Sequence, residues 1–313
     1  MLNVAVIGMG WWGKTLVTAI GKSSKLRVVK GVKRNPATEA EFAREHKFEI
    51  ISDYSGVLKD PTIQGVVLCT PHTLHTEQII AAAKAGKHIF CEKPLSLTHT
   101  DVVRALDTVN KNKVTLAVGH ERRFEPPILD LMRTVRSGEL GTPLQVEANF
   151  SQDKFLAFPL DNWRLTPEEA PAGPMTATGI HILDLAVGVF GEAESVVCNV
   201  KQLGSRLSNG DTLAALVSFR KGGHALLTAI LATPFDGRFA VSSDGNTALK
   251  LSAPLSFRAL TTSNSAPETR SPGRFQSDPR RKEKGAPPER SAFCHSVSDR
   301  LSDGDRRCRH PRH

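Results

Sequence analysis

The sequence predicts an α/β protein with two ordered parts: a doubly wound parallel sheet, followed by an α+β domain with an open, mainly antiparallel sheet. In the first 120 residues, short apolar runs alternate with helical patterns, which is typical of a parallel sheet with helices on both faces. After residue 121 the alternation stops, and β-like runs follow one another across Gly- and Asn-containing turns. A chain of 313 residues is long enough for both domains.

The parallel sheet is expected within residues 1–120. Its first strand, Leu2–Ile7, is a short apolar run, as expected of a strand that is buried on both faces. Further strands are predicted at 26–32, 63–69, 87–91 and 115–119, and helices at 14–22, 39–46, 76–85 and 101–110.

The second domain is expected to span residues 121–264. A helix is predicted at 127–137 and a strongly apolar helix at 180–190, with an irregular stretch at 151–178 between them. Strands are expected at 144–150, 196–202, 212–220, 224–231 and 248–251. Because no further strand pattern follows, we expect this domain to be incomplete.

The last segment, residues 265–313, has a low-complexity basic composition. Its only large aliphatic or Phe residues are Phe275, Phe293, Val297 and Leu301, so we expect no packed core and predict disorder. It contains 12 Lys and Arg against 7 Asp and Glu, which is more than half of the net charge of +9. A shifted reading frame or a lost natural end is one explanation, and a genuine basic tail is the other.

The composition excludes several classes of protein. Outside the tail no basic stripe is interleaved with aromatic residues, so we do not expect the body of the chain to bind nucleic acid, and such binding would depend on the tail. No apolar run approaches the ~18 residues of a membrane span, and the chain starts directly in a strand without a secretion signal.

The five cysteines (69, 91, 198, 294 and 308) form no CxxC pair. We interpret them as reduced thiols of a cytoplasmic protein.

A glycine motif follows the first strand and opens a helix. Gly8, Gly10 and Gly13 match the G-x-G-x-x-G pattern of the Rossmann fold, in which the glycines permit a tight turn, approach of a pyrophosphate and close helix packing. Trp11 and Trp12 lie inside this cofactor-binding segment, and we expect them to pack rather than to catalyse. The alternative is an ordinary Gly-rich turn between a strand and a helix.

The end of the second strand carries Lys33 and Arg34 where an acidic residue usually binds the adenosine ribose. Two cations cannot accept a hydrogen bond from a ribose hydroxyl, but they suit a 2′-phosphate. We therefore expect NADP in preference to NAD. The alternative is a solvated basic turn.

Two more loops follow predicted strands, at the carboxyl ends where chemistry gathers in such folds. The cofactor-binding residues expected in them are Thr70, Pro71, His75, Glu92 and Lys93. His72 and His75 together suggest a metal site, but no third ligand is evident, and we expect no metal.

Five segments occur in the order seen in the Gfo/Idh/MocA family of nicotinamide-dependent sugar and polyol oxidoreductases, which the chain resembles over roughly residues 1–255. The segments are VAVIGMGWWG, TPHTLH, CEKPLS, GHERRFEP and GPMTATGIHILD. Glu92-Lys93-Pro94 is the most specific of the matches. The resemblance implies a homo-oligomer, because the open sheet of the family often packs face to face between subunits.

The resemblance also implies two catalytic residues. Lys93 would lie beside the nicotinamide and contact the substrate oxygen, and His181 would act as acid/base. Both roles agree with the chemistry, because a histidine titrates near neutral pH and a lysine stabilises a developing alkoxide. His181 is expected in the first turn of its helix, where the dipole disfavours the imidazolium. The alternatives are a satisfied histidine at a helix start and a surface lysine.

One position departs from the family. Many members carry an aspartate four residues before the histidine, and this chain has Ala177 there. This weakens the prediction of an inositol- or glucose-type dehydrogenase. The residues expected to contact the substrate are His120, Arg123, Trp163, Arg164 and Asp184, and ordinary surface positions are the alternative. Arg122 lies beside His120 and Arg123 at the junction of the domains and is expected at the same cleft, and a second role suggested for Asp184 is to orient His181.

The predicted function is that of an NAD(P)-dependent dehydrogenase or reductase acting on the CH–OH group of a sugar, polyol or related hydroxy or keto compound. A non-catalytic, dinucleotide-binding redox sensor is the second hypothesis, and Ala177 and the unusual tail favour it. Nucleic-acid binding through the tail is the third.

Overall fold

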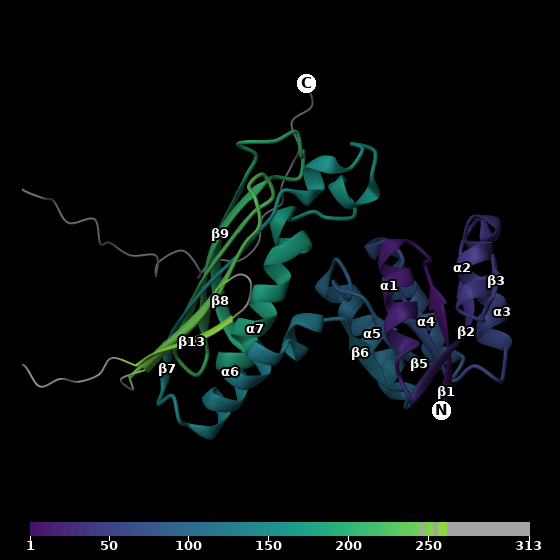
Figure 1. Cartoon of the computed structure of the whole chain (residues 1–313), viewed down its shortest axis with the longest axis horizontal. Helices are drawn as coiled ribbons and strands as arrows, with labels where there is room; N and C mark the ends of the chain where they lie inside the picture. The colour runs from purple at the N-terminus through teal and green to yellow at the C-terminus, as the bar shows by residue number, and fades with distance from the viewer. Residues whose placement is uncertain (245–246, 253–255, 262–313) are drawn as a thin grey trace, which may run out of the picture. The chain divides into compact units, whose positions relative to one another are not determined.

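The computed structural model describes residues 1–244, 247–252 and 256–261. Its first sheet contains β1 (Leu2–Ile7), β2 (Leu26–Val32), β3 (Glu49–Ile51), β4 (Gly65–Leu68), β5 (His88–Cys91) and β6 (Leu116–Val118). The six strands are parallel and run in the order β3-β2-β1-β4-β5-β6 (Figure 1). This confirms the predicted doubly wound sheet, and its topological switch point lies between β1 and β4.

Helices cover both faces of this sheet because the side chains of each strand alternate between two cores. The helices are α1 (Trp11–Ile20), α2 (Ala40–Glu45), α3 (Tyr54–Lys59), α4 (His75–Lys84) and α5 (His99–Lys111). Val4 and Val6 of β1 belong to the core shared with α1 and α2. Ala5 and Ile7 belong to the core shared with α3, α4 and α5.

The sequence patterns missed two short elements of this domain, β3 and α3. β3 has only three residues, which is too few for a detectable period. The first turn of α3 contains Gly56, a weak helix former, but the carboxylate of Asp53 caps the helix by accepting hydrogen bonds from the Ser55 and Gly56 amides at 2.8 and 3.0 Å. That cap was the available signal.

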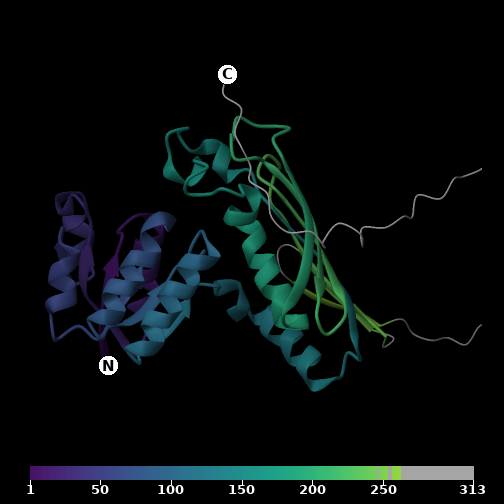
Figure 2. The same cartoon turned by 180° about the vertical axis from the view of Figure 1, so that it is seen from behind.

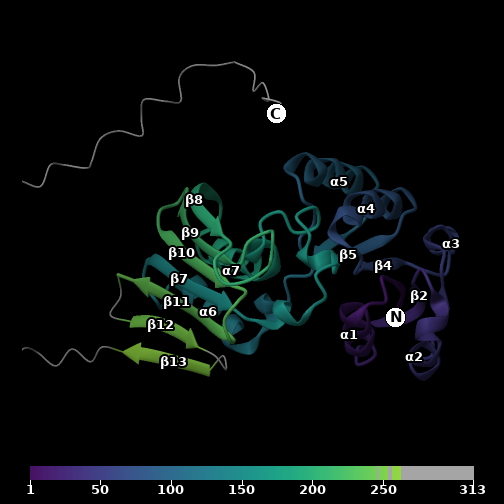
Figure 3. The ribbon, with the colours of Figure 1, turned by 90° about the horizontal axis from the view of Figure 1, so that it is seen from above.

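The second sheet has seven strands. They are β7 (Pro143–Ser151), β8 (Ala193–Lys201), β9 (Thr212–Phe219), β10 (His224–Ile230), β11 (Asp236–Ser243), β12 (Thr247–Ser252) and β13 (Ser256–Thr261). Their order is β13-β12-β11-β7-β10-β9-β8 (Figure 3). Among the described strand pairs of this second sheet, only β7 and β10 are parallel. The prediction of a mainly antiparallel sheet is therefore confirmed.

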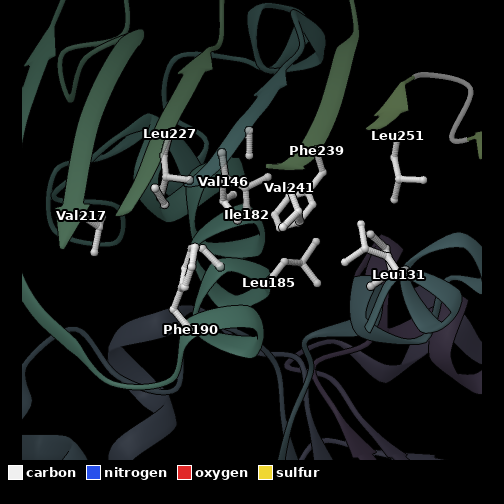
Figure 4. Packing of buried hydrophobic residues seen from close by; sticks show 14 of the residues in the cluster. Leu131, Val146, Ile182, Leu185, Phe190, Val217, Leu227, Phe239, Val241 and Leu251 are labelled. Carbon is white, nitrogen blue, oxygen red and sulfur yellow. The ribbon is translucent and has the colours of Figure 1, made fainter. Parts of the chain in front are cut away.

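Two helices, α6 (Pro126–Ser137) and α7 (Ile180–Phe190), cover one face of this sheet (Figure 2). Leu131 of α6 and Ile182 and Leu185 of α7 pack against inward-facing strand residues such as Val146 and Leu227 (Figure 4). α7 occupies the predicted residues because its sequence is almost wholly apolar.

The sequence patterns missed β11 and β13. In β11 only Phe239 and Val241 are large inward-facing apolar residues, and Ala240 between them is itself apolar, so the alternation is faint. The predicted tail at 265–313, with Cys294 and Cys308, lies outside the described residues. Among the described residues, no helix is both long and apolar enough to cross a membrane.

Replacing Gly13 with alanine is expected to lower the free energy of unfolding by about 1–3 kcal/mol, the usual cost of overpacking. A Cβ at Gly13 would lie 2.2 Å from the Gly8 carbonyl oxygen, so α1 would have to move away from the turn. Urea denaturation measures the change. Gly10→Ala is the matched control, because a Cβ there meets no atom within 4 Å and should leave stability unchanged. Equal stability of the Gly13→Ala and wild-type proteins would contradict the expectation.

Candidate active site

A cavity of about 280 Å³ lies beyond the carboxyl ends of β1, β4 and β5. One wall comes from the loops that follow these strands, and the other comes from residues 121–181 of the second domain. The residues that line it are Trp11, Trp12, Cys69, Thr70, His72, Glu92, Lys93, Glu121, Arg122, Phe150, Gln152, Lys154, Phe155, Phe158, Trp163, Arg164, Ala177 and His181.

The glycine turn has the features that a dinucleotide requires. Gly8 has a φ of 95°, which only glycine adopts without strain, and a Cβ there would lie 2.7 Å from the Cys69 carbonyl oxygen. Gly10 faces open space, and no side chain caps the amides at the start of α1. Uncapped helix amides next to an open space suit a phosphate group.

Lys93 reaches the cavity from the loop after β5, where its peptide bond to Pro94 is cis. Its Nζ donates a hydrogen bond to the Ala177 carbonyl oxygen at 2.9 Å. Burial lowers the pKa of Lys93 to about 8, although Glu121 and Glu92 partly oppose the change. The ammonium group therefore titrates close to neutral pH.

Glu92 precedes Lys93 and is buried. Burial raises the pKa of its carboxyl group to about 7, and the positive charge of Lys93 limits the increase. Near neutral pH this residue is thus divided between its acidic and carboxylate forms. The cavity contains a second carboxyl group in Glu121, which is more exposed.

His181 is buried in α7, beside the ring of Phe150 at 5.8 Å between centroids. Burial, followed by the positive charges of Lys93 and Arg122, lowers its pKa to about 2. Its Nδ1 atom makes no hydrogen bond with any described residue, and the nearest carboxylate oxygen is Oε2 of Glu121, at 3.6 Å.

The helix-dipole explanation for a neutral His181 is wrong. A π-helical turn at Met175–Gly179 leads directly into α7, and Gly179 itself has helical backbone angles. His181 therefore does not lie at a free helix start. Its low pKa comes from burial and from neighbouring cations.

The expected cofactor contact at His75 needs correction. His75 is fully buried and does not line the cavity. Its Nδ1 and Nε2 atoms lie 2.8 and 3.0 Å from the carbonyl oxygens of Pro94 and Thr70. It therefore connects the two loops that carry Thr70 and Lys93. Pro71 also lies outside the lining, whereas Thr70 is part of it.

Three of the expected substrate residues do not line this cavity, although the ring of His120 lies 6.5 Å from that of His181 between centroids. Arg123 donates two hydrogen bonds to the Asp184 carboxylate, at 2.5 and 2.6 Å, and His120 Nε2 lies 3.7 Å from the same group. Arg123 and Asp184 line a separate cavity beside α6 and α7. The suggestion that Asp184 orients His181 is therefore wrong, whereas Trp163 and Arg164 do line the central cavity.

The basic turn after β2 is less cationic than its sequence suggests. Lys33 is paired with the buried carboxylate of Glu39, which also lies 3.2 Å from Lys14 Nζ. Arg34 is exposed and makes no hydrogen bond or ion pair with any described residue. Of the two predicted cations, Arg34 is therefore the one without a negatively charged partner among the described residues.

Sequence reasoning missed several residues of the cavity. Glu121 belongs to GHERRFEP, one of the segments that carry the family resemblance, so its signal was present, whereas its neighbour Arg122 was expected at the domain junction and does line the cavity. Phe150, Gln152, Lys154, Phe155 and Phe158 come from the end of β7 and the irregular stretch after it, where no periodic pattern points to a site.

Comparisons with known proteins agree with this arrangement. Residues 2–120 match the family model described as an oxidoreductase family with an NAD-binding Rossmann fold, and residues 128–247 match the Gfo/Idh/MocA C-terminal domain. The chain is 33% identical over 206 residues to the levoglucosan dehydrogenase of Pseudarthrobacter phenanthrenivorans, covering 62% of this chain and 53% of that one. It is also 33% identical over 172 residues to the myo-inositol 2-dehydrogenase of Thermotoga maritima, covering 53% and 49%.

The chain thus spans about half the length of these two curated relatives. A solved structure of levoglucosan dehydrogenase in complex with NADH and levoglucosan is similar with a TM-score of 0.73 and 25% identity, over 83% of this chain and 80% of that one. The two family models cover most of both sheets, and the resemblance seen in the sequence is confirmed. The chain belongs to the Gfo/Idh/MocA family of oxidoreductases.

Proposed function

We propose that the protein is an NAD(P)-dependent oxidoreductase that acts on a CH–OH group of a sugar, a polyol or a related compound. The observation that carries this proposal is the meeting of Lys93 and His181 in one cavity that the glycine turn also borders. The names of the relatives, a levoglucosan and an inositol dehydrogenase, support the same class of substrate.

The residues that would hold the dinucleotide are the Gly8–Gly13 turn, Thr70 and the Glu92-Lys93 pair. A bound nicotinamide dinucleotide supplies or accepts the hydride.

We keep the preference for NADP because Arg34 is uncompensated and exposed. The family description and the NADH-bound relative support NAD instead. Comparing the dissociation constants of NADPH and NADH decides the question, and tighter binding of NADH would reject the preference.

In the oxidative direction the chain has to remove the hydroxyl proton of the substrate. The neutral imidazole of His181 accepts this proton, and the ammonium group of Lys93 stabilises the alkoxide that forms. In the reductive direction the ammonium group of Lys93 is the available donor of the proton to the carbonyl oxygen, because the imidazole of His181 is neutral. We propose that Glu121 holds the imidazole in one tautomer, because its carboxylate is the nearest to His181 Nδ1.

The variant Glu121→Gln tests this role. We expect kcat to fall about tenfold, equivalent to about 1.4 kcal/mol of transition-state stabilisation, while KM changes little. The pH profile of kcat should shift as well, because the negative charge of Glu121 raises the pKa of Lys93, and its loss lowers that pKa. Glu77→Gln, at an exposed position of α4 that pairs with Arg104, is the control. If both variants behave alike, Glu121 has no special part in the reaction.

Hydride transfer, followed at 340 nm across a panel of sugars and polyols, tests the enzymatic function. Turnover of at least one compound, with the signal lost in Lys93→Ala, is the expected result. The redox-sensor alternative predicts tight dinucleotide binding, no turnover of any compound and no effect of Lys93→Ala. That outcome would reject the enzymatic proposal.

We further propose that the protein is a homo-oligomer that associates through the outer face of the second sheet. Val197, Leu216 and Leu226 form a cross-strand row on β8, β9 and β10, and their side chains are 74%, 42% and 42% exposed. Contiguous apolar surface of this kind often marks an interface. Light scattering coupled to size exclusion measures the mass, and a monomer at micromolar concentration would reject this proposal.

A further inference from the structure

A buried carboxylate joins the two elements between which the adenosine ribose of a dinucleotide lies in a Rossmann fold. These elements are the helix α1 that follows the glycine turn and the end of β2. Glu39 pairs through Oε1 with Lys33, which follows β2, and its Oε2 lies 3.2 Å from Nζ of Lys14 in α1. Each oxygen of the carboxylate therefore binds a lysine from one of the two elements.

A tight turn directly after β2 places Glu39 between these lysines. The 3-10 helix η1 (Pro36–Glu39) begins with a proline, whose fixed φ favours the first helical position. The hydroxyl group of Thr38 donates a hydrogen bond to the Asn35 carbonyl oxygen at 2.9 Å and closes the turn. As a result, the side chain of Glu39 reaches back to the end of the strand, where Lys33 lies.

The carboxylate is covered, whereas the lysines are accessible. The side chain of Glu39 is 10% exposed, and those of Lys33 and Lys14 are 30% and 39% exposed. Burial alone would raise the pKa of the Glu39 carboxyl group, but the two ammonium groups outweigh burial and lower this pKa. Glu39 is therefore ionised at neutral pH, and it compensates one of the two lysine charges.

A phosphate on the 2′-oxygen of the ribose would meet two different cations here. Arg34 is exposed and free to bind it, but Lys33 is already bound to Glu39. If Lys33 turns to the phosphate, the buried carboxylate loses one of its two partners. If Lys33 stays, the phosphate lies close to a negative charge. Either outcome weakens the binding of the phosphate.

We infer that Glu39 is a specificity residue for the dinucleotide, because it holds Lys33 and so weakens the binding of a 2′-phosphate relative to a free 2′-hydroxyl. The preference for NADP that we ascribe to Arg34 is then smaller than two free cations would give. The inference rests on the proposed function, because it concerns the cofactor of the same protein.

The variant Glu39→Gln tests this role in the full chain by binding alone. Dissociation constants of NADPH and NADH are measured by tryptophan fluorescence, because Trp11 and Trp12 line the cavity. Adenosine 2′,5′-bisphosphate and 5′-AMP, measured by competition, report on the ribose end alone. We expect the affinities for NADPH and the bisphosphate to rise about tenfold and those for NADH and 5′-AMP to change less than about threefold, since one partly screened charge is removed.

Three further variants control the measurement. Glu39→Met removes the same charge and should give the same shift, whereas Glu39→Asp keeps the charge and should give less of it. Glu41→Gln, at an exposed position of α2, is the matched control for the loss of one negative charge nearby. Urea denaturation shows that each variant is folded.

An unchanged ratio of NADPH to NADH affinity in Glu39→Gln, or an equal shift in Glu41→Gln, would overturn the inference. So would a loss of NADH affinity with NADPH affinity unchanged, because Glu39 would then be a ligand of the ribose hydroxyls. The expected shift without turnover of any compound supports the inference and rejects the enzymatic function. Turnover without the shift does the reverse, and if neither dinucleotide binds, both proposals fail.

Discussion

Replacing Lys93 with methionine is expected to lower kcat/KM about 10²- to 10³-fold, the range found when one donor to a developing oxyanion is removed. Methionine keeps most of the length and apolar character of the side chain, so the cavity stays filled. What is lost is the ammonium group to which we assign the stabilisation of the alkoxide. Steady-state kinetics with any compound that the protein turns over measures the effect.

The pH dependence provides a second readout for Lys93. Its pKa is lowered to about 8 from the ordinary value, and the protonated form is the one that stabilises the alkoxide. Activity in the oxidative direction should therefore fall as the pH rises through about 8. Lys93→Arg should move this descending limb beyond the measurable range, and Lys93→Met should abolish it.

Loss of the hydrogen bond to Ala177 is a separate consequence of the same change. NADH affinity and urea denaturation of Lys93→Met show whether the cavity is still formed. Lys84→Met, at an exposed position near the end of α4, controls for the removal of a lysine in general. Unchanged kcat/KM in Lys93→Met, with NADH affinity and stability intact, would reject the role of Lys93.

Replacing His181 with asparagine is expected to lower kcat/KM about 10²- to 10⁴-fold, the usual contribution of a positioned general acid or base. Asparagine is polar and small enough to be accommodated, but it does not titrate. Because burial and nearby cations lower the pKa of His181 to about 2, the imidazole is neutral throughout the accessible pH range. The base form is thus always available for oxidation.

It follows that kcat/KM for oxidation should stay flat from neutral pH down to about pH 5, because the pKa of an ordinary histidine, near 6.5, no longer applies. The stability of the protein limits the lowest pH of the measurement. An ascending limb between pH 6 and 7 that disappears in His181→Asn would contradict the neutral state inferred for this histidine. Wild-type kinetics in His181→Asn would contradict its role altogether.

The elements around the glycine turn were predictable because their signals are local. Leu2–Ile7 and Leu26–Val32 are strands in the residues that the sequence patterns predicted, since both are mainly apolar runs between polar turns. The glycine motif could be read for the same reason. β3 and β11 escaped because one is too short and the other alternates too weakly for periodicity to show.

The side chains of the cavity were harder to predict, because their direction depends on packing between distant segments. Arg123 and Arg122 are neighbours in sequence, yet only Arg122 lines the central cavity, while Arg123 binds Asp184. His75 lies in the sequence close to the end of a strand, where a cofactor contact is expected. Both of its ring nitrogens, however, lie beside backbone carbonyl oxygens. Spacing alone does not reveal such partners.

The contact between Lys93 and residue 177 has a consequence for sequence variation at that position. The acceptor is a main-chain oxygen, which every amino acid supplies, so a substitution at position 177 leaves the attachment of the lysine in place. The side chain at 177, which lines the cavity, can therefore be exchanged without removing the hydrogen-bond acceptor of the lysine. Position 177 tolerates substitution in this respect because the lysine binds a main-chain oxygen there. Alanine at 177 is therefore compatible with a functional Lys93.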